Sequence, residues 1–471
     1  MLSTTGNVLT VGLGIVAFVI FYRMKRRLSF PPGPRSFPIL GNATQIPRER
    51  PVLQYNRWAK EYGDMYYLSF LGSHVIVVNN SEVVNELLVK RSGNYSDRGR
   101  MTMLTELWVF LPDLYLSDTH FLSLVLRMGW DFAFGLMPFG DRWRRHRRMF
   151  DSWFRPSYVS SSDWRQIQTT YIHSLLVDLL DEHEPVHQHI HRVITLFMYG
   201  LDTEKEGGFM MSHAMKAMDG FQQASVPGAF LVDIIPSLKY VPSWFPGAKF
   251  KRRASEWKEH ALAMIDTPFR IVQELVAAGK AQDCFVANVL GNLEKSGERD
   301  TLNLETLRNC AGMGYIAGHD TFLSTFMSFF LAMALHPEVQ VKAQEELDKA
   351  CTRRIPEFSD RPSLPYVDAL CVELSRWATV APLALPHTVT KGDVYKGYFI
   401  PAGTTILGTS SSFFHWQVKK LTNNGQQTAI NHDEKVYPEP HKFKPERYLS
   451  EDGSSCMASN ASSDAFGFGR R

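Results

Sequence analysis

The chain has 471 residues, a formal net charge of +3 at pH 7, and 44% hydrophobic and 12% aromatic residues. This composition describes a globular protein with ample material for a core, and it gives no support to a nucleic-acid-binding protein with a sustained basic face. The five cysteines are widely spaced and form no C-x-x-C pair, which argues against a disulfide framework or a zinc cluster.

The first 27 residues predict a membrane anchor. The run from Val8 to Tyr22 is uncharged and apolar, and counted from Leu2 it reaches about 20 residues, enough to cross a bilayer. The basic cluster Arg23–Arg27 comes directly after it, which places the N-terminus outside and the remainder in the cytosol. A cleaved signal peptide is disfavoured, because no basic residue precedes the run and no small-residue cleavage site comes after it.

Residues 28–50 predict a proline-rich hinge, in which the motif Pro31–Pro34 is a stiff, non-helical spacer between membrane and body. A helix is expected from Val52 to Tyr62. Two short strands about a turn at Gly72 come next, and a further helix is expected from Glu82 to Lys90. The sequence therefore predicts a small sheet early in the chain.

A basic helix is predicted from Gly140 to Arg148, in which Trp143 and Arg147 are four positions apart and share one face. Such a helix most often presents a solvated face. A tryptophan and an arginine on the same side can also hold an anionic ligand group, and the pattern leaves both interpretations open.

Two later segments carry weaker signals. The segment His183–His187 matches the zinc-protease pattern H-E-x-x-H, but Pro185 interrupts the continuous helix that this site needs, so a loop at a helix boundary is expected instead. The apolar, proline-punctuated segment Pro227–Arg253 ends in basic residues, which is typical of a loop that touches a membrane or gates an apolar pocket.

The central element is a predicted helix from Leu304 to Leu335, about 48 Å long, capped by Asn303 and stopped by Pro337. It is apolar on nearly every face, so it should cross the middle of the protein. Its polar pentad Ala317–Thr321 includes a glycine that lets a bulky group approach the backbone. Thr321 can bond back to the carbonyl of Ala317 and bend the helix. An ordinary core helix with a tolerated polar pair remains the alternative.

The last third of the chain adds an acid and a base, Glu373 and Arg376, on one helical face. That spacing is common by chance. The order of the remaining motifs is more informative: Pro382, Pro386 and His387, a strand pair through Tyr395 to Ile400, a turn at Pro401–Gly403, the motif Pro445–Tyr448, and the closing run Phe466–Arg471.

Taken in this order, the motifs resemble those of the cytochrome P450 family, in particular membrane-anchored haem-thiolate monooxygenases of the fungal microsomal kind. The resemblance covers essentially the whole chain through the anchor, the proline hinge, W-x-x-x-R, A-G-x-D-T, E-x-x-R, P-E-R and F-G-F-G-x-R. It implies a mostly α fold, a helical prism with small β-sheets behind the anchor, with haem between the central helix and the final loop. Residues 51–471 would form the catalytic domain, incomplete at its C-terminus.

The resemblance also implies roles for individual residues. It assigns proton delivery during oxygen activation to Asp320 and Thr321. It assigns binding of haem b to Trp143, Arg147, His387, Phe466, Gly469 and Arg471, and a structural ion network to Glu373, Arg376 and Arg447. The implied reaction is the insertion of one oxygen atom from O₂ into an apolar small molecule, in secondary metabolism, at the endoplasmic reticulum membrane. Electrons would come from NADPH through a partner, NADPH–cytochrome P450 reductase.

The sequence departs from the family in three places. The cysteine that ligates the iron is expected two positions after Arg471, and none of the five cysteines (Cys284, Cys310, Cys351, Cys371 and Cys456) is in that register. The stretches 108–127 and about 411–427 interrupt the family pattern, as translated introns or as surface loops. A haem-free, inactive member of the family is therefore the alternative function. No motif encodes the substrate, its regiochemistry or the oligomeric state.

Overall fold

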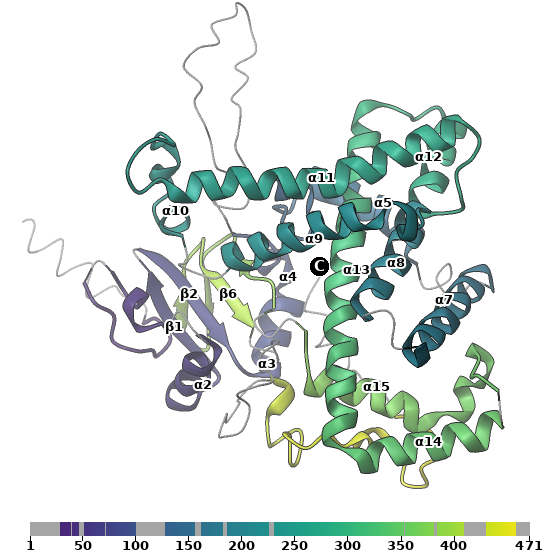
Figure 1. The fold of residues 1–471 in the computed structure, drawn as a ribbon. Coiled ribbons are helices and arrows are strands. Elements are labelled where there is room, and N and C mark those ends of the chain that lie inside the picture. Colours follow the sequence, from purple (N-terminus) through teal and green to yellow (C-terminus); the bar gives the residue numbers. More distant parts are fainter. Residues whose placement is uncertain are drawn as a thin grey trace, which may run out of the picture.

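Helices make up most of the structure, a computed structural model that describes residues 29–38, 40–46, 51–70, 72–99, 128–155, 162–181, 186–225, 230–352, 354–380, 384–408 and 430–457 (Figure 1). The predicted anchor at 1–27, the two interrupting stretches at 108–127 and 411–427, and the closing motif at 466–471 lie outside the described residues.

Thirteen α-helices lie in the part of the chain that the structure describes. They are α2 (Pro51–Tyr62), α3 (Ser81–Val84), α4 (Ser92–Tyr95), α5 (Asp141–Trp153), α7 (Ser162–Asp181), α8 (Val186–Tyr199), α9 (Thr203–Ser225), α10 (Leu231–Ile234), α11 (Lys249–Ala277), α12 (Phe285–Ser296), α13 (Thr301–Leu335), α14 (Pro337–Cys351) and α15 (Pro365–Trp377). Shorter helical turns are η1 (Ala43–Gln45), η2 (Asn85–Lys90), η4 (Trp130–Phe132), η5 (Pro236–Tyr240), η6 (Phe358–Ser363), η8 (Ile430–His432) and η9 (Pro445–Tyr448).

The predicted early sheet is present and is completed by strands from the end of the chain. Its order is β1 (Met65–Phe70), β2 (Ser73–Val78), β6 (Thr405–Gly408) and β3 (His387–Thr388). The β1–β2 pair is antiparallel about the Gly72 turn, β2 runs parallel to β6, and β3 runs antiparallel to β6. A separate hairpin joins β4 (Asp393–Tyr395) to β5 (Tyr398–Ile400). The sheet therefore fixes His387 beside the N-terminal part of the body.

The helix α13 passes through the middle of the molecule, with α9 and α11 across its upper end and α14 and α15 at its lower end (Figure 1). It has 35 residues and begins three residues earlier than expected, because Asp300 rather than Asn303 caps it; the Asp300 carboxylate accepts a hydrogen bond from the Asn303 amide at 2.7 Å. α13 ends at Leu335, before Pro337, as predicted, and Pro337 is the first residue of α14.

Glycines on α13 allow its neighbours to pack unusually close. A Cβ atom at Gly312 would lie 2.4 Å from Cγ2 of Ile265 on α11, and one at Gly314 would lie 2.5 Å from Cε of Met198 on α8.

Within the described residues, no single helix is long and apolar enough to cross a membrane. The helices α13 and α14, taken together, have the length and composition of a membrane span, but they are bent by 104° relative to each other.

The proline-rich segment is bound to the sheet rather than standing apart as a simple spacer. The amide of Tyr67 on β1 donates to the carbonyl of Pro32 at 2.8 Å, and the Phe30 ring stacks on the Tyr67 ring with centroids 4.7 Å apart. The Asn42 side chain donates to the Pro34 carbonyl at 3.2 Å and accepts from the Ser69 amide at 2.9 Å. Residues 30–38 and 40–42 are therefore packed against β1 as part of the folded body.

Replacing Gly33 with alanine should detach this segment. The new Cβ would lie 2.1 Å from the carbonyl oxygen of Tyr67, so the backbone has to move away and lose the hydrogen bond to Pro32. We expect a loss of about 1–3 kcal/mol in unfolding free energy and faster amide exchange in β1. The control is Gly291→Ala on α12, where no atom lies within 4 Å, which should stabilise the protein by up to about 1 kcal/mol. Equal effects of the two substitutions would contradict this.

Candidate functional site

The polar pentad of α13 lies in an unbroken helix, and its threonine faces outward. The Thr321 hydroxyl donates to the Ala317 carbonyl at 2.6 Å, so the predicted back-bond is confirmed. Thr321 is exposed, Asp320 is partly buried, and Phe322 beside them is 52% exposed. α13 is buried mainly between Thr306 and His319, and it is more exposed beyond that point. The hydroxyl, the carboxylate and the aromatic ring therefore lie next to one another where the exposed part of the helix begins.

Behind this turn, His319 points the other way, into a buried contact with α8. Its ring stacks on Tyr315 with centroids 6.3 Å apart and meets the His191 ring edge-on at 5.9 Å. The Tyr315 hydroxyl shares a hydrogen bond of 2.7 Å with Nδ1 of His191. Burial, together with the charge of His187, lowers the pKa of His319 to about 4. His319 is therefore neutral at pH 7, and it joins the pentad to α8.

This histidine should make the fold sensitive to acid. The pKa of His319 in the folded protein is below its ordinary value of 6.5, so the unfolded chain binds the proton more readily. Stability should fall as the pH drops below about 6.5, with a loss of about 3 kcal/mol from this group once the pH is below about 4. Urea unfolding from pH 7.5 to 4 should show a shallower decline for His319→Phe than for the parent protein. The same dependence of unfolding free energy on pH in both proteins would show that His319 is not the group responsible.

The helix α5 brings the predicted Trp143 and Arg147 to α13, but in different environments. Trp143 is 8% exposed and packs against Phe139 with ring centroids 5.2 Å apart. Arg147 is exposed, and its Nε pairs with the Asp151 carboxylate at 2.9 Å. Between them, His146 is buried; its Nδ1 donates to the Arg142 carbonyl, and its Nε2 accepts from the Asn309 amide of α13 at 3.1 Å. That bond fixes α5 against the central helix.

His387 lies on β3 and is 4% exposed. Its Nδ1 donates to the carbonyl of Tyr95, at the end of α4, at 2.9 Å. For Nε2 also to donate to an anionic group, the ring has to be protonated, and a bound carboxylate would favour that form.

Arg98 is a further buried cation at this place, and the sequence reasoning missed it. It is 9% exposed; its Nε donates to the Gly135 carbonyl at 3.0 Å, and one terminal nitrogen donates to the carbonyls of Leu385 and Pro386, both at 2.7 Å. The guanidinium therefore joins its own segment to the segment around Gly135 and to the two residues that precede His387. No spacing rule identifies such a residue, because its partners are backbone carbonyls.

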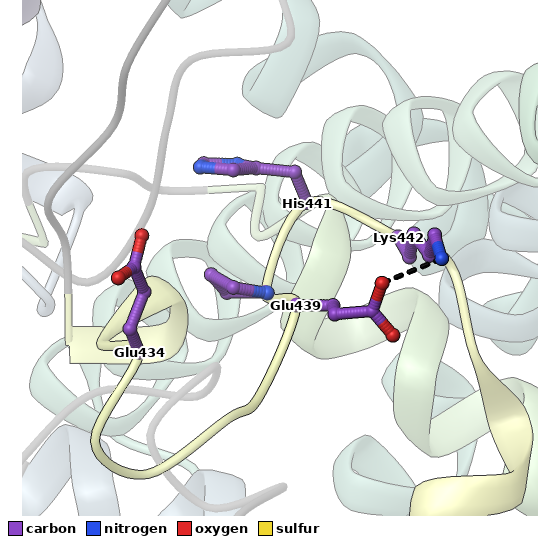
Figure 2. Close-up of a pocket in the computed structure, with 5 residues that line it drawn as sticks. Glu434, Glu439, His441 and Lys442 are labelled. Carbon is purple, nitrogen blue, oxygen red and sulfur yellow. Dashed lines mark ion pairs between the residues drawn. The ribbon is translucent and has the colours of Figure 1, made fainter.

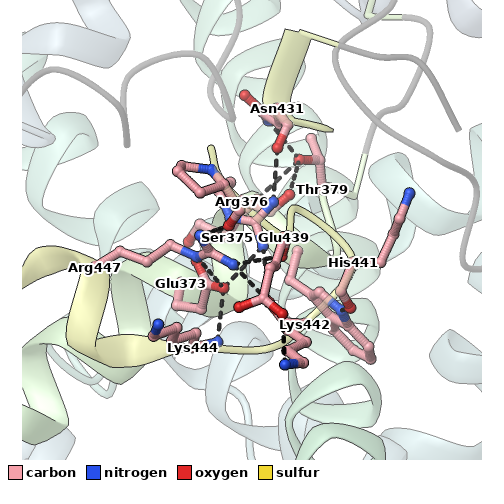
Figure 3. A network of polar contacts seen from close by, with 12 residues as sticks. Glu373, Ser375, Arg376, Thr379, Asn431, Glu439, His441, Lys442, Lys444 and Arg447 are labelled. Carbon is pink, nitrogen blue, oxygen red and sulfur yellow. Dashed lines mark hydrogen bonds and ion pairs between the residues drawn. The ribbon is translucent and has the colours of Figure 1, made fainter. Parts of the chain in front are cut away.

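Glu373, Arg376 and Arg447 lie together in one buried ion network (Figure 3). Both Glu373 oxygens accept from Arg376, at 2.7 and 2.8 Å, and one also accepts from Nε of Arg447 at 3.2 Å and from the Lys444 amide at 2.9 Å. Arg376 also donates to the Asn431 carbonyl at 2.7 Å. The network therefore holds α15 against η8 and η9.

The structure describes fewer contacts for the other sites that sequence patterns suggested. Three of the predicted haem-binding residues, Phe466, Gly469 and Arg471, lie outside the described residues, as do residues 183–185 of the H-E-x-x-H segment. In the described part of the chain, no three histidine, cysteine or acidic side chains gather in a way that could hold a metal ion. A surface hollow lined by Glu434, Glu439, Pro440, His441 and Lys442 contains none of the predicted site residues (Figure 2).

The buried cysteines Cys284 and Cys310 do not supply a ready thiolate. Cys284 caps α12 by accepting from the Ala287 amide, and burial raises its pKa to about 11. Burial also raises the pKa of Cys310, within α13. These side chains are therefore protonated thiols at pH 7, whereas a metal ligand has to be a thiolate.

Comparison with known proteins points to one family. The sequence model described as Cytochrome P450 matches residues 31–110, 132–416 and 426–471. The unmatched residues 111–131 and 417–425 overlap the two stretches that interrupt the family pattern. The match therefore covers the pentad, the ion network and every described residue of the candidate site.

Fungal relatives of this chain match it over nearly its whole length. Cytochrome P450 monooxygenase COX2 of Coprinopsis cinerea is 37% identical over 99% of this chain and 83% of its own length. Cytochrome P450 monooxygenase ple1 of Rhodocybe pseudopiperita is 37% identical over 97% of this chain and 81% of its own length. Tryptamine 4-monooxygenase of Psilocybe cyanescens is 34% identical over 98% and 86%.

Proposed function

This chain belongs to the cytochrome P450 family of monooxygenases, and from that premise we propose that it inserts one oxygen atom from O₂ into an apolar small molecule of secondary metabolism. The observation that carries the proposal is the outward-facing turn of α13, where Asp320, Thr321 and the apolar Phe322 are together at an open place in the core helix. The polar pair suits proton transfer, and the apolar surroundings suit a hydrophobic substrate.

The described residues fit the haem that the family uses. Two propionate carboxylates need cationic or hydrogen-bonding partners. Trp143, Arg147 and His387 supply these from α5 and β3, and Arg98 adds a buried guanidinium beside His387. We propose these four residues as the propionate-binding set. When bound, the haem would supply the activation of O₂, with electrons from NADPH through a partner reductase.

The residues of the pentad would then handle protons and water. The Thr321 hydroxyl donates to the Ala317 carbonyl, so its oxygen keeps lone pairs that can accept from a water molecule on the open side. The partly buried Asp320 carboxylate is next to it and can exchange protons with solvent. The pair would pass protons one at a time to the reacting oxygen, while His319 holds the turn against α8.

Threonine substitutions test this role in the haem-loaded protein. Thr321→Ala should lower the yield of oxygenated product per NADPH by at least about tenfold and release peroxide instead, because the water-holding hydroxyl is lost. The matched control is Thr325→Ala: its hydroxyl makes the same back-bond, to the Thr321 carbonyl at 2.8 Å, one turn farther along. Asp320→Asn should slow turnover and shift its pH profile. An equal yield of oxygenated product per NADPH in the Thr321 and Thr325 variants would refute the proposal.

We also propose that the protein sits on the endoplasmic reticulum membrane, with its body in the cytosol. The anchor sequence at 1–27 supports this. In support, the segment around α10 and η5 exposes apolar side chains: Leu231, Tyr240, Trp244 and Phe245 are 61%, 64%, 78% and 48% exposed. Resistance of the full chain to carbonate extraction, and release after deletion of residues 1–27, is the expected result; extraction of the intact chain would contradict it.

A further inference from the structure

Two histidines from different helices meet nitrogen to nitrogen on the upper side of the molecule. His213 is on α9 and His260 is on α11, the two helices that lie across the end of α13 (Figure 1). Their Nδ1 atoms are 3.1 Å apart, and the rings cross at 64° with centroids 4.9 Å apart. Both side chains are partly exposed, so ions from solvent can reach the seam between them.

This separation matches the spacing of two ligands on one metal ion. Zinc–imidazole bonds are about 2.0–2.1 Å long, so an ion bonded to both nitrogens would see them at an angle of about 100°. That angle lies between the right angle of square-planar sites and the tetrahedral angle. To bind one ion, both rings have to turn so that their Nδ1 lone pairs point at a common place beside the line that joins the two atoms.

The protonation state of His213 suits metal binding. Burial and the neighbouring His260 lower the pKa of His213, so the ring is neutral at pH 7. Without a metal, one Nδ1–H donates to the other Nδ1; with a metal, the donor ring moves its proton to Nε2, so no proton need be released. Of the charged neighbours, Glu259 favours a cation here and Lys216 opposes it. The Phe209 ring packs 4.2 Å from His213 and holds it in place.

We propose that His213 and His260 form a binding site for a divalent transition-metal ion, zinc or copper(II), which joins α9 to α11. Water would complete the coordination, and copper(II) should bind more tightly than zinc, in keeping with the general order for nitrogen ligands. An ion at this seam would restrain the relative movement of the two helices above the central helix. This site is separate from the haem-binding residues and does not depend on the proposed reaction.

Titration calorimetry of the purified full chain with zinc chloride or copper(II) chloride alone tests the site. His213→Ala and His260→Ala should each weaken binding at least tenfold, because each removes one of two ligands. Lys216→Ala, one turn from His213, should tighten binding about two- to threefold, since it removes a nearby positive charge. His213→Phe keeps the ring packing against Phe209 and should weaken binding as much as His213→Ala, which separates lost ligation from lost packing.

His187→Ala is the second control, because His187 belongs to the H-E-x-x-H segment at the start of α8. This variant should leave the metal affinity of the His213–His260 site unchanged. Binding that persists in both the His213 and His260 variants, or that is lost only in His187→Ala, would overturn the proposal. Copper(II) binding should also give an electron paramagnetic resonance spectrum with coupling to two imidazole nitrogens, reduced to one in either single variant.

Discussion

Replacing Glu373 with alanine is expected to destabilise the protein by about 3–5 kcal/mol, enough to unfold a domain of ordinary stability. Glu373 is completely buried and Arg376 is 1% exposed. Removing the carboxylate leaves the Arg376 guanidinium buried without its counter-charge, and it takes one hydrogen bond each from Arg447 and from the Lys444 amide. The ends of α15 and η9 should separate, with loss of soluble expression and of haem binding.

Chemical unfolding measured by circular dichroism checks this result. The matched control is Glu446→Ala, which removes a carboxylate on η9 that pairs with Lys342 at 2.6 Å in a partly exposed position. Exposed pairs contribute about 1 kcal/mol or less, so this variant should fold and bind haem. A Glu373 variant as stable as the Glu446 variant would show that the buried network does not hold this region together.

Arg98→Ala is expected to have the second-largest effect, a loss of about 4 kcal/mol in unfolding free energy. Three hydrogen bonds from a charged donor are lost, and the carbonyls of Gly135, Leu385 and Pro386 are left buried without it. Because the same guanidinium is a proposed partner of a haem propionate, haem affinity should fall further than stability alone explains. The stability and haem affinity of Arg98→Lys should lie between those of the parent protein and Arg98→Ala. An ammonium group cannot reach all three carbonyls with the same geometry.

Denaturant unfolding and haem titration of the two Arg98 variants provide the measurement. Arg144→Ala is the control: it removes an exposed arginine that pairs with Asp141 on the surface of α5. That variant should change stability by less than about 1 kcal/mol and leave haem affinity unchanged. Haem affinity that falls in the Arg144 variant as much as in Arg98→Ala would show that only general surface charge matters.

Local rules were sufficient for much of this site. The back-bond of Thr321 and the end of α13 before Pro337 arise from interactions within a few positions, and the structure has both. The start of α13 was wrong by three residues, because Asp300 competes with Asn303 as the cap and its carboxylate reaches the amide of Asn303 itself. Capping competition of this kind is decided by geometry that a spacing rule does not contain.

Long-range contacts were beyond the sequence. Arg98 donates to carbonyls 37, 287 and 288 positions away, and any residue can supply a carbonyl, so no pattern indicates it. The attachment of the proline segment depends in the same way on the amide of Tyr67 and the space beside Gly33. The His213–His260 pair was equally hidden, because α9 and α11 bring together residues 47 positions apart.

The reduced carbon-monoxide spectrum is the most direct test of a haem-thiolate monooxygenase built on this fold. It should be recorded on the protein whose sequence continues past Arg471 through the cysteine expected two positions later, and on the same protein with that cysteine changed to serine. We expect the spectrum of thiolate-ligated haem in the first protein and its loss in the second. A thiolate spectrum in the 471-residue chain, whose five cysteines are all out of register, or in the serine variant, would contradict this assignment of the iron ligand.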